Sequence, residues 1–143
     1  MEIKFQQQSD DVTCTAACIV MIMNFPIERV LMDLNFAHAY RVDGFNAICD
    51  FFDKWDMPYE LLDLKQQQIE FGNLYLAVVP SLNSVATNHH VIIDARDYIK
   101  VHDPNMGRAG KKYYTALTSD EKPSDAVFLK SYRLDLKMTA FSV

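Results

Sequence analysis

The chain has few positive charges and no long apolar run, and each shortage excludes a class of function. Its 14 Lys and Arg against 19 Asp and Glu give a net charge of −5. The basic residues are scattered, so they form no stripe that would bind the phosphates of a nucleic acid. The longest apolar stretch, from Cys18 to Met23, is far shorter than the ~20 residues that span a bilayer. We therefore expect no nucleic-acid partner and no membrane span.

Signal-peptide features and abundant cysteines are missing as well. Glu2 stands where a signal peptide carries basic residues, and no apolar segment follows it. We expect a complete, cytoplasmic chain. The three cysteines, Cys14, Cys18 and Cys49, cannot all pair with one another, and so few of them do not make a disulfide scaffold. The open question is whether one of these thiols has a chemical role.

The order of the expected elements indicates the fold class. Residues 1–143 have the size and the apolar content of a single domain. A run that is apolar all round predicts a buried helix at Cys14 to Met23, and Pro26 ends it and begins a shorter helix through Leu34. Apolar residues at helical spacing predict a third helix at Phe45 to Trp55. Helices followed by strands predict an α+β domain, with N-terminal helices packed on an antiparallel β-sheet. The predicted strands are Glu2 to Phe5, Tyr59 to Leu64, Leu74 to Val79, His90 to Ile93, Tyr98 to Val101 and Ala126 to Leu136.

Cys14 lies where a polar loop enters the most apolar of these helices. The N-terminus of a helix favours an anion, so a cysteine at this point gains thiolate character and therefore reactivity. A cysteine beside an apolar helix is by itself more often a core residue. Cys18, one turn further into the helix, and Cys49 fit that interpretation, and we assign both to packing.

The residues expected around Cys14 favour catalysis. A cysteine nucleophile needs a base, a group that orients the base, and donors for the oxyanion. Gln8 stands six residues before Cys14, and His89 and His90 begin a predicted strand. A short hairpin returns the next strand to Asp103, so that a carboxylate reaches the imidazole. Cys, His and Asp in this order, with a glutamine at that offset, predict a thiol enzyme.

These segments resemble the papain-like cysteine peptidases that remove double-glycine leader peptides from bacteriocins and peptide signals, usually as a domain of an ABC exporter. The resemblance implies a papain-like fold with Cys14 as the nucleophile and Gln8 as the oxyanion donor. It also implies His89 as the base, Asp103 as its orienter, and neither metal nor cofactor. The matching segments are Gln8 with Cys14 to Cys18, Asn88 to Ile92, and Val101 to Pro104 with Gly107.

Three positions depart from the family pattern. Thr15 replaces the usual glycine, Thr13 replaces an acidic residue, and His90 stands where an aromatic or small residue is usual. The last departure leaves two candidate bases, because His89 and His90 point to opposite faces of a strand. A three-residue hairpin loop would put His89 opposite Asp103, whereas a loop of two or four residues would favour His90. We prefer His89, where the resemblance places the base.

The expected function is cleavage of a peptide bond, and the resemblance implies an extended peptide or protein substrate with small residues before the cut, such as a glycine pair. The same residues can also perform deamidation or acyl transfer. A non-catalytic, peptide-binding module is the alternative from another class, although such modules characteristically lose the nucleophile. The chain carries no G-x-x-x-x-G-K-[ST] motif. An ABC exporter partner would therefore be a separate chain.

Overall fold

The computed structural model describes residues 3–8, 14–30, 48–85, 87–118 and 122–138. Helix α1 (Cys14–Met23) has the bounds that the sequence predicts. It ends at Asn24, whose φ of 56° is the left-handed conformation of a helix cap, and whose N–H donates to the Val20 carbonyl at 2.7 Å. The other two predicted helices are confirmed over residues 27–30 and 48–54, and the rest of their predicted lengths, apart from Pro26 and Trp55, lies outside the described residues.

The main sheet has the strand order β1-β7-β2-β3-β4, and every neighbouring pair in it is antiparallel. Two further strands, β5 and β6, pair in parallel as a separate small sheet. The protein is thus an α+β structure with an antiparallel sheet, as the sequence predicts. The strands are β1 (Glu60–Leu61), β2 (Leu74–Pro80), β3 (Asn88–Asp94), β4 (Lys100–His102), β5 (Tyr113–Thr115), β6 (Ala126–Phe128) and β7 (Arg133–Met138).

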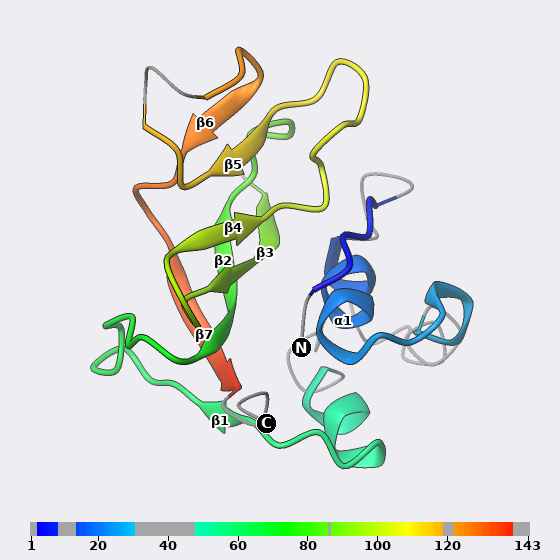
Figure 1. The fold of residues 1–143 in the computed structure, drawn as a ribbon. Coiled ribbons are helices and arrows are strands. Elements are labelled where there is room, and N and C mark those ends of the chain that lie inside the picture. Colours follow the sequence, from blue (N-terminus) through cyan, green and yellow to red (C-terminus); the bar gives the residue numbers. More distant parts are fainter. Residues whose placement is uncertain (1–2, 9–13, 31–47, 86, 119–121, 139–143) are drawn as a thin grey trace.

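The main sheet buries both of its faces. Leu76 and Ile92 pack against α1 and the helix at 48–54, which lie together on one side of the sheet (Figure 1). Tyr75, Val91 and Ile93 belong to a second core on the other face. Because both faces are buried, β2 and β3 read as continuous apolar runs instead of alternating with polar residues. The first core fixes α1 against β3, and this contact positions the candidate site.

A β-bulge in β7 lets one strand serve both cores. Leu76 pairs with Leu136, but the next residue, Ala77, pairs with Leu134, so that Asp135 is the extra residue. Without the bulge, Leu134 and Leu136, which are two positions apart, would point to the same face of the sheet. With it, Leu136 packs on the α1 side and Leu134 packs in the opposite core.

Four strand predictions need correction, and one strand was missed. The strand predicted over Tyr98 to Val101 begins only at Lys100 and runs to His102. Residues 3–8 form no strand, and β1 is only two residues long because Asp63 begins a turn, in which its carboxylate accepts from Lys65 N at 2.8 Å. The single strand predicted over Ala126 to Leu136 is two strands, because residues 129–132 cross from the small sheet to the large one. Strand β5 was not predicted at all. Its three residues are too few for a period-two pattern to stand out.

The hairpin between β3 and β4 differs in length from the predicted one but keeps its parity. Ile92 pairs with His102 and Asp94 with Lys100, so the loop holds the five residues 95–99. Asp103 is therefore not directly opposite His89 but diagonal to it. Because the loop has an odd number of residues, His89 and Asp103 still point to the same face of the sheet. A loop with an even number of residues would have placed His90 on the face of Asp103.

Within the described part of the chain, no helix is both long enough and apolar enough to cross a membrane.

Truncating Ile92 should strongly destabilise the protein, because its side chain is fully buried between β3 and α1. We expect Ile92→Ala to lower the free energy of unfolding by about 2–5 kcal/mol in urea denaturation. The matched control is Tyr98→Ala, since Tyr98 is 64% exposed in the hairpin loop. Equal losses in the two variants would contradict the packing of α1 on β3.

Candidate active site

His89 and Asp103 form a buried pair at the end of the main sheet. The His89 Nε2 atom lies 2.6 Å from Asp103 Oδ1, and both side chains are almost completely buried. His89 comes from the start of β3, and Asp103 follows the last residue of β4. The antiparallel register brings these two strand ends together. The sequence prediction that Asp103 contacts His89 is thus met by this contact.

The backbone around Asp103 fixes its carboxylate. Asn105 N donates to Oδ1 at 2.9 Å, and Tyr114 N donates to Oδ2 at 2.7 Å. Charge-assisted bonds of this kind stabilise the ionised form of a carboxylate. The Tyr114 hydroxyl in turn donates to the Pro80 carbonyl at 2.6 Å, which ties β5 to the end of β2. Tyr114 is a site residue that the sequence analysis missed, and the β-prone run of residues 113–115 was the available signal.

Cys14 is the first residue of α1 and is partly buried beside the start of β3. Burial raises the pKa of its thiol, but hydrogen bonds from His89 and His90, together with the charge of the two rings, outweigh burial and lower the pKa to about 5. Cys14 is therefore a thiolate at neutral pH. This is the property of a nucleophile and not of a packing cysteine.

The ionisation of His89 complements that of Cys14. Burial lowers the pKa of the imidazole, but hydrogen bonds and charge from Asp103 and Cys14 outweigh it and raise the pKa to about 9. Between about pH 5 and pH 9 the two groups are a thiolate and an imidazolium. Because Nε2 is taken by Asp103, Nδ1 is the ring nitrogen left for the sulfur.

The other two cysteines are protonated thiols. Burial, with smaller effects from Cys14 and Asp103, raises the pKa of Cys18 well above its usual value. Its thiol donates to the His90 carbonyl, with 3.5 Å between Sγ and O. Burial also raises the pKa of Cys49. Both residues lie in the core beneath the sheet, as the packing interpretation predicts.

His90 and Thr15, two of the departures from the family pattern, contact each other. The Nδ1 atom of His90 lies 2.7 Å from the Thr15 hydroxyl oxygen. That oxygen is 3.9 Å from the Cys14 sulfur, the outer limit of a hydrogen bond to sulfur. The two histidines therefore approach Cys14 with different partners, His89 with a carboxylate and His90 with a hydroxyl. The sequence analysis did not predict the contact of His90 with Thr15.

Gln8 is buried against the loop that follows Asp103. Its N–H donates to the Pro104 carbonyl at 2.9 Å, and the side-chain amide of Gln7 donates to the Met106 carbonyl at 3.0 Å. Gly107 sits so close to Gln7 that an added Cβ would lie 3.0 Å from the amide nitrogen. The Gln8 segment and the Asp103 loop thus form one packed unit. The link from Gln8 to Cys14, residues 9–13, lies outside the described residues.

Comparison with protein-family models, with curated proteins and with solved structures found no match to this chain. The resemblance to papain-like peptidases therefore rests on the sequence motifs alone. Among the described residues, no three His, Cys, Asp or Glu side chains gather in a way that could hold a metal ion.

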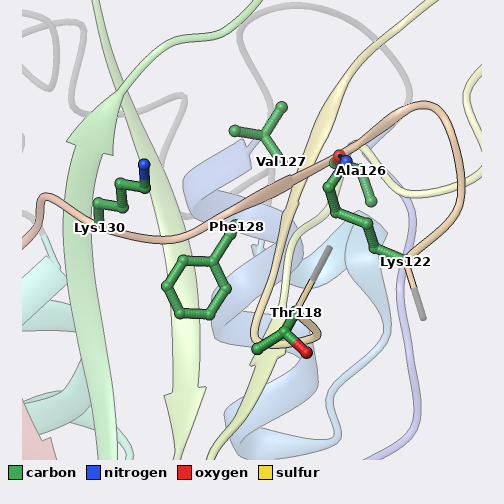
Figure 2. A pocket seen from close by; sticks show the side chains of 6 residues that line it. All are labelled: Thr118, Lys122, Ala126, Val127, Phe128 and Lys130. Atoms are coloured by element: carbon green, nitrogen blue, oxygen red, sulfur yellow. Dashed lines mark hydrogen bonds between the residues drawn. The ribbon is translucent and has the colours of Figure 1, made fainter. Parts of the chain in front are cut away.

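A separate open pocket of about 530 Å³ lies over β6 and the segments on either side of it (Figure 2). Its lining is mostly apolar, and in Figure 2 the side chains of Lys122 and Lys130 lie on opposite sides of Phe128. Lys122 donates to the Ala126 carbonyl at 3.0 Å. None of the candidate catalytic residues lines this pocket, so we assign no chemistry to it. Its lining residues are Thr118, Lys122, Ala126, Val127, Phe128 and Lys130.

The three thiols should differ sharply in reactivity. We expect iodoacetamide at pH 7 to alkylate Cys14 quickly and to leave Cys18 and Cys49 unmodified in the folded protein, because only Cys14 is a thiolate. Mass spectrometry of the digested protein locates the adduct. Labelling in urea provides the control, since all three thiols should then react alike. Comparable labelling of Cys18 or Cys49 in folded protein would remove Cys14 as the nucleophile.

Proposed function

We propose that this chain is a cysteine peptidase of the papain-like type, with a papain-like fold, which cleaves a peptide bond by means of Cys14. The observation that supports the proposal most strongly is the 2.6 Å contact between His89 and Asp103 next to a thiol whose pKa is about 5. A peptide-binding module needs neither a lowered thiol pKa nor a carboxylate fixed by two backbone amides. The arrangement is costly to build and is useful for nucleophilic catalysis.

The residues have distinct roles in the proposed reaction. The Cys14 thiolate bonds to the carbonyl carbon, and the oxyanion is stabilised by the Gln8 side-chain amide and the Cys14 N–H. His89 gives its proton to the amide nitrogen, the C–N bond breaks, and the acyl group stays on Cys14. Water then attacks the thioester as His89 takes its proton, and the acid leaves as the thiolate is restored. Asp103 holds the ring orientation and stabilises the imidazolium.

The substrate and the setting belong to the same proposal. The resemblance implies an extended peptide or protein substrate with small residues before the cut, such as a glycine pair, and an ABC exporter on a separate chain. Cys14, Cys18 and Cys49 are all free thiols. Free thiols, one of them reactive, suit a reducing compartment, which supports a cytoplasmic location.

Replacing Gln8 tests whether the chain is an enzyme or a retained scaffold. We expect Gln8→Ala to lower kcat for peptide cleavage by about 10²–10³-fold, because an oxyanion donor acts mainly in the transition state. Peptide affinity should change little. The experiment measures cleavage of a peptide with a central Gly-Gly by mass spectrometry, and its affinity by calorimetry.

Gln6→Ala is the matched control, because Gln6 is a nearby glutamine whose side-chain amide donates to the carbonyl of the adjacent Gln7. Circular dichroism confirms that both variants fold. Unchanged cleavage in Gln8→Ala would remove Gln8 from the site. No cleavage of any peptide by the unmodified protein would favour deamidation, acyl transfer or recognition.

The pH dependence of cleavage should be bell-shaped. The rate should rise through about pH 5, as Cys14 ionises, and fall through about pH 9, as His89 loses the proton that the leaving amine needs. Because Asp103 raises the pKa of His89, we expect Asp103→Asn to move the upper limb down by about 1–3 units. The control is Asp97→Asn, which removes an exposed carboxylate from the hairpin loop. An upper limb that stays in place in Asp103→Asn would rule out Asp103 as the partner of His89.

A further inference from the structure

A hydroxyl group lies within reach of both the nucleophile and the second histidine. Thr15 is the second residue of α1 and His90 is the third residue of β3, 75 positions apart, yet Oγ1 and Nδ1 are 2.7 Å from each other. The same oxygen lies 3.9 Å from Cys14 Sγ. The hydroxyl therefore offers a path for a proton from the sulfur to the imidazole, beside the hydrogen bond that His90 itself makes with Cys14.

The packing of α1 on β3 holds these three groups in place. The backbone of His90 accepts a bond from Cys18, one turn further along α1. Ile92, two residues later on the same face, lies in the core that contains α1. His89 lies on the other face of β3, together with its partner Asp103. The sulfur is thus approached by two imidazoles that are held by separate sets of contacts.

We propose that Cys14, Thr15 and His90 form a hydroxyl-bridged proton relay that ionises Cys14 independently of the His89–Asp103 pair. The relay rests on the proposed function in one respect only, the assignment of Cys14 as the nucleophile. It adds a positioning residue, Thr15, and a second proton acceptor, His90, to a site whose chemistry otherwise needs one histidine.

The proton balance of the relay is simple. In the thiol state, Cys14 S–H donates to Thr15 Oγ1, and the Thr15 hydroxyl donates to the unprotonated Nδ1 of His90. The thiol proton passes to Oγ1 as the hydroxyl proton passes to Nδ1. The S–H bond breaks, an N–H bond forms, and the hydroxyl is restored. The products are a Cys14 thiolate that accepts from Thr15 and a His90 imidazolium that donates to it.

The relay divides the work of the two histidines. His89, which Asp103 keeps protonated, is suited to donate to the leaving amine. His90 has a hydroxyl in place of a carboxylate as its partner, and in the relay it receives the thiol proton through that hydroxyl. Within the described residues, His89 and His90 of β3 act on Cys14, Cys14 in turn acts on Cys18 of α1, and Asp103 after β4 acts on His89 and Cys18. Both histidines contribute to the low pKa of Cys14.

The test measures the ionisation of Cys14 without His89. The rate of alkylation of Cys14 by iodoacetamide is followed from pH 4 to pH 10 in His89→Ala and in its double variants. We expect the midpoint in His89→Ala to stay below 9.0, the ordinary value for a thiol. Adding Thr15→Val, which removes the hydroxyl at constant shape, should raise the midpoint by about one unit. Thr15→Ser, which keeps the hydroxyl, should leave the midpoint in place.

A double-mutant cycle shows whether Thr15 acts through His90. In a His89→Ala, His90→Phe background, Thr15→Val should have no further effect on the midpoint. The relay is overturned if Thr15→Val leaves the midpoint in place, if Thr15→Ser shifts it equally, or if the effect of Thr15→Val persists without His90. Thr15→Ala replaces Thr15→Val should the latter fail to fold, as judged by circular dichroism.

Alkylation requires only a thiolate, so the test does not depend on any peptide being cleaved. A shifted midpoint together with an unmodified protein that cleaves nothing would support the relay and count against the peptidase. An unshifted midpoint in a protein that cleaves peptides would overturn the relay alone.

Discussion

The carboxylate of Asp103 is the group on which the candidate site depends. Two backbone amides, from Asn105 and Tyr114, and the His89 ring surround it in a buried position. A buried charge is tolerated only when it is paired and hydrogen-bonded, and here the pairing comes from three separate segments. The carboxylate thereby connects β3, the turn after β4, and β5. Remove its charge, and the imidazolium of His89 loses the partner that offsets the cost of its own burial.

Much of this arrangement was predictable from the sequence because it follows from periodicity and chain order. The bounds of α1 come from one apolar run, and the meeting of His89 with Asp103 needs only a hairpin with an odd loop. Loop length did not need to be right for the outcome to be right, because side-chain direction depends on parity alone. The expectation that His89 and Asp103 lie directly opposite each other was nevertheless wrong, because the two residues are diagonal neighbours.

What the sequence could not supply are contacts between elements distant in the chain. Nothing in residues 113–115 points to Asp103, since Tyr114 contributes a backbone N–H that every residue but proline has. The contact of Thr15 with His90 depends on how α1 lies along β3. Likewise the bulge at Asp135 was not predicted, because the composition of this segment indicated one regular strand. Tertiary packing determines these contacts and the bulge, and it leaves no pattern in the local sequence.

The order of these groups along the chain has a consequence for synthesis. Cys14 leaves the ribosome before the histidines that lower its pKa, which follow at least 75 residues behind, and before Tyr114, which follows later still. Until that length has emerged and β3 has paired, the sulfur is an ordinary thiol that is almost entirely protonated at neutral pH. The nascent chain therefore carries its reactive residue in an inert form. Reactivity arises with tertiary structure, so in a stalled or truncated chain that ends before residue 89 we expect Cys14 to be no more reactive than Cys18 or Cys49.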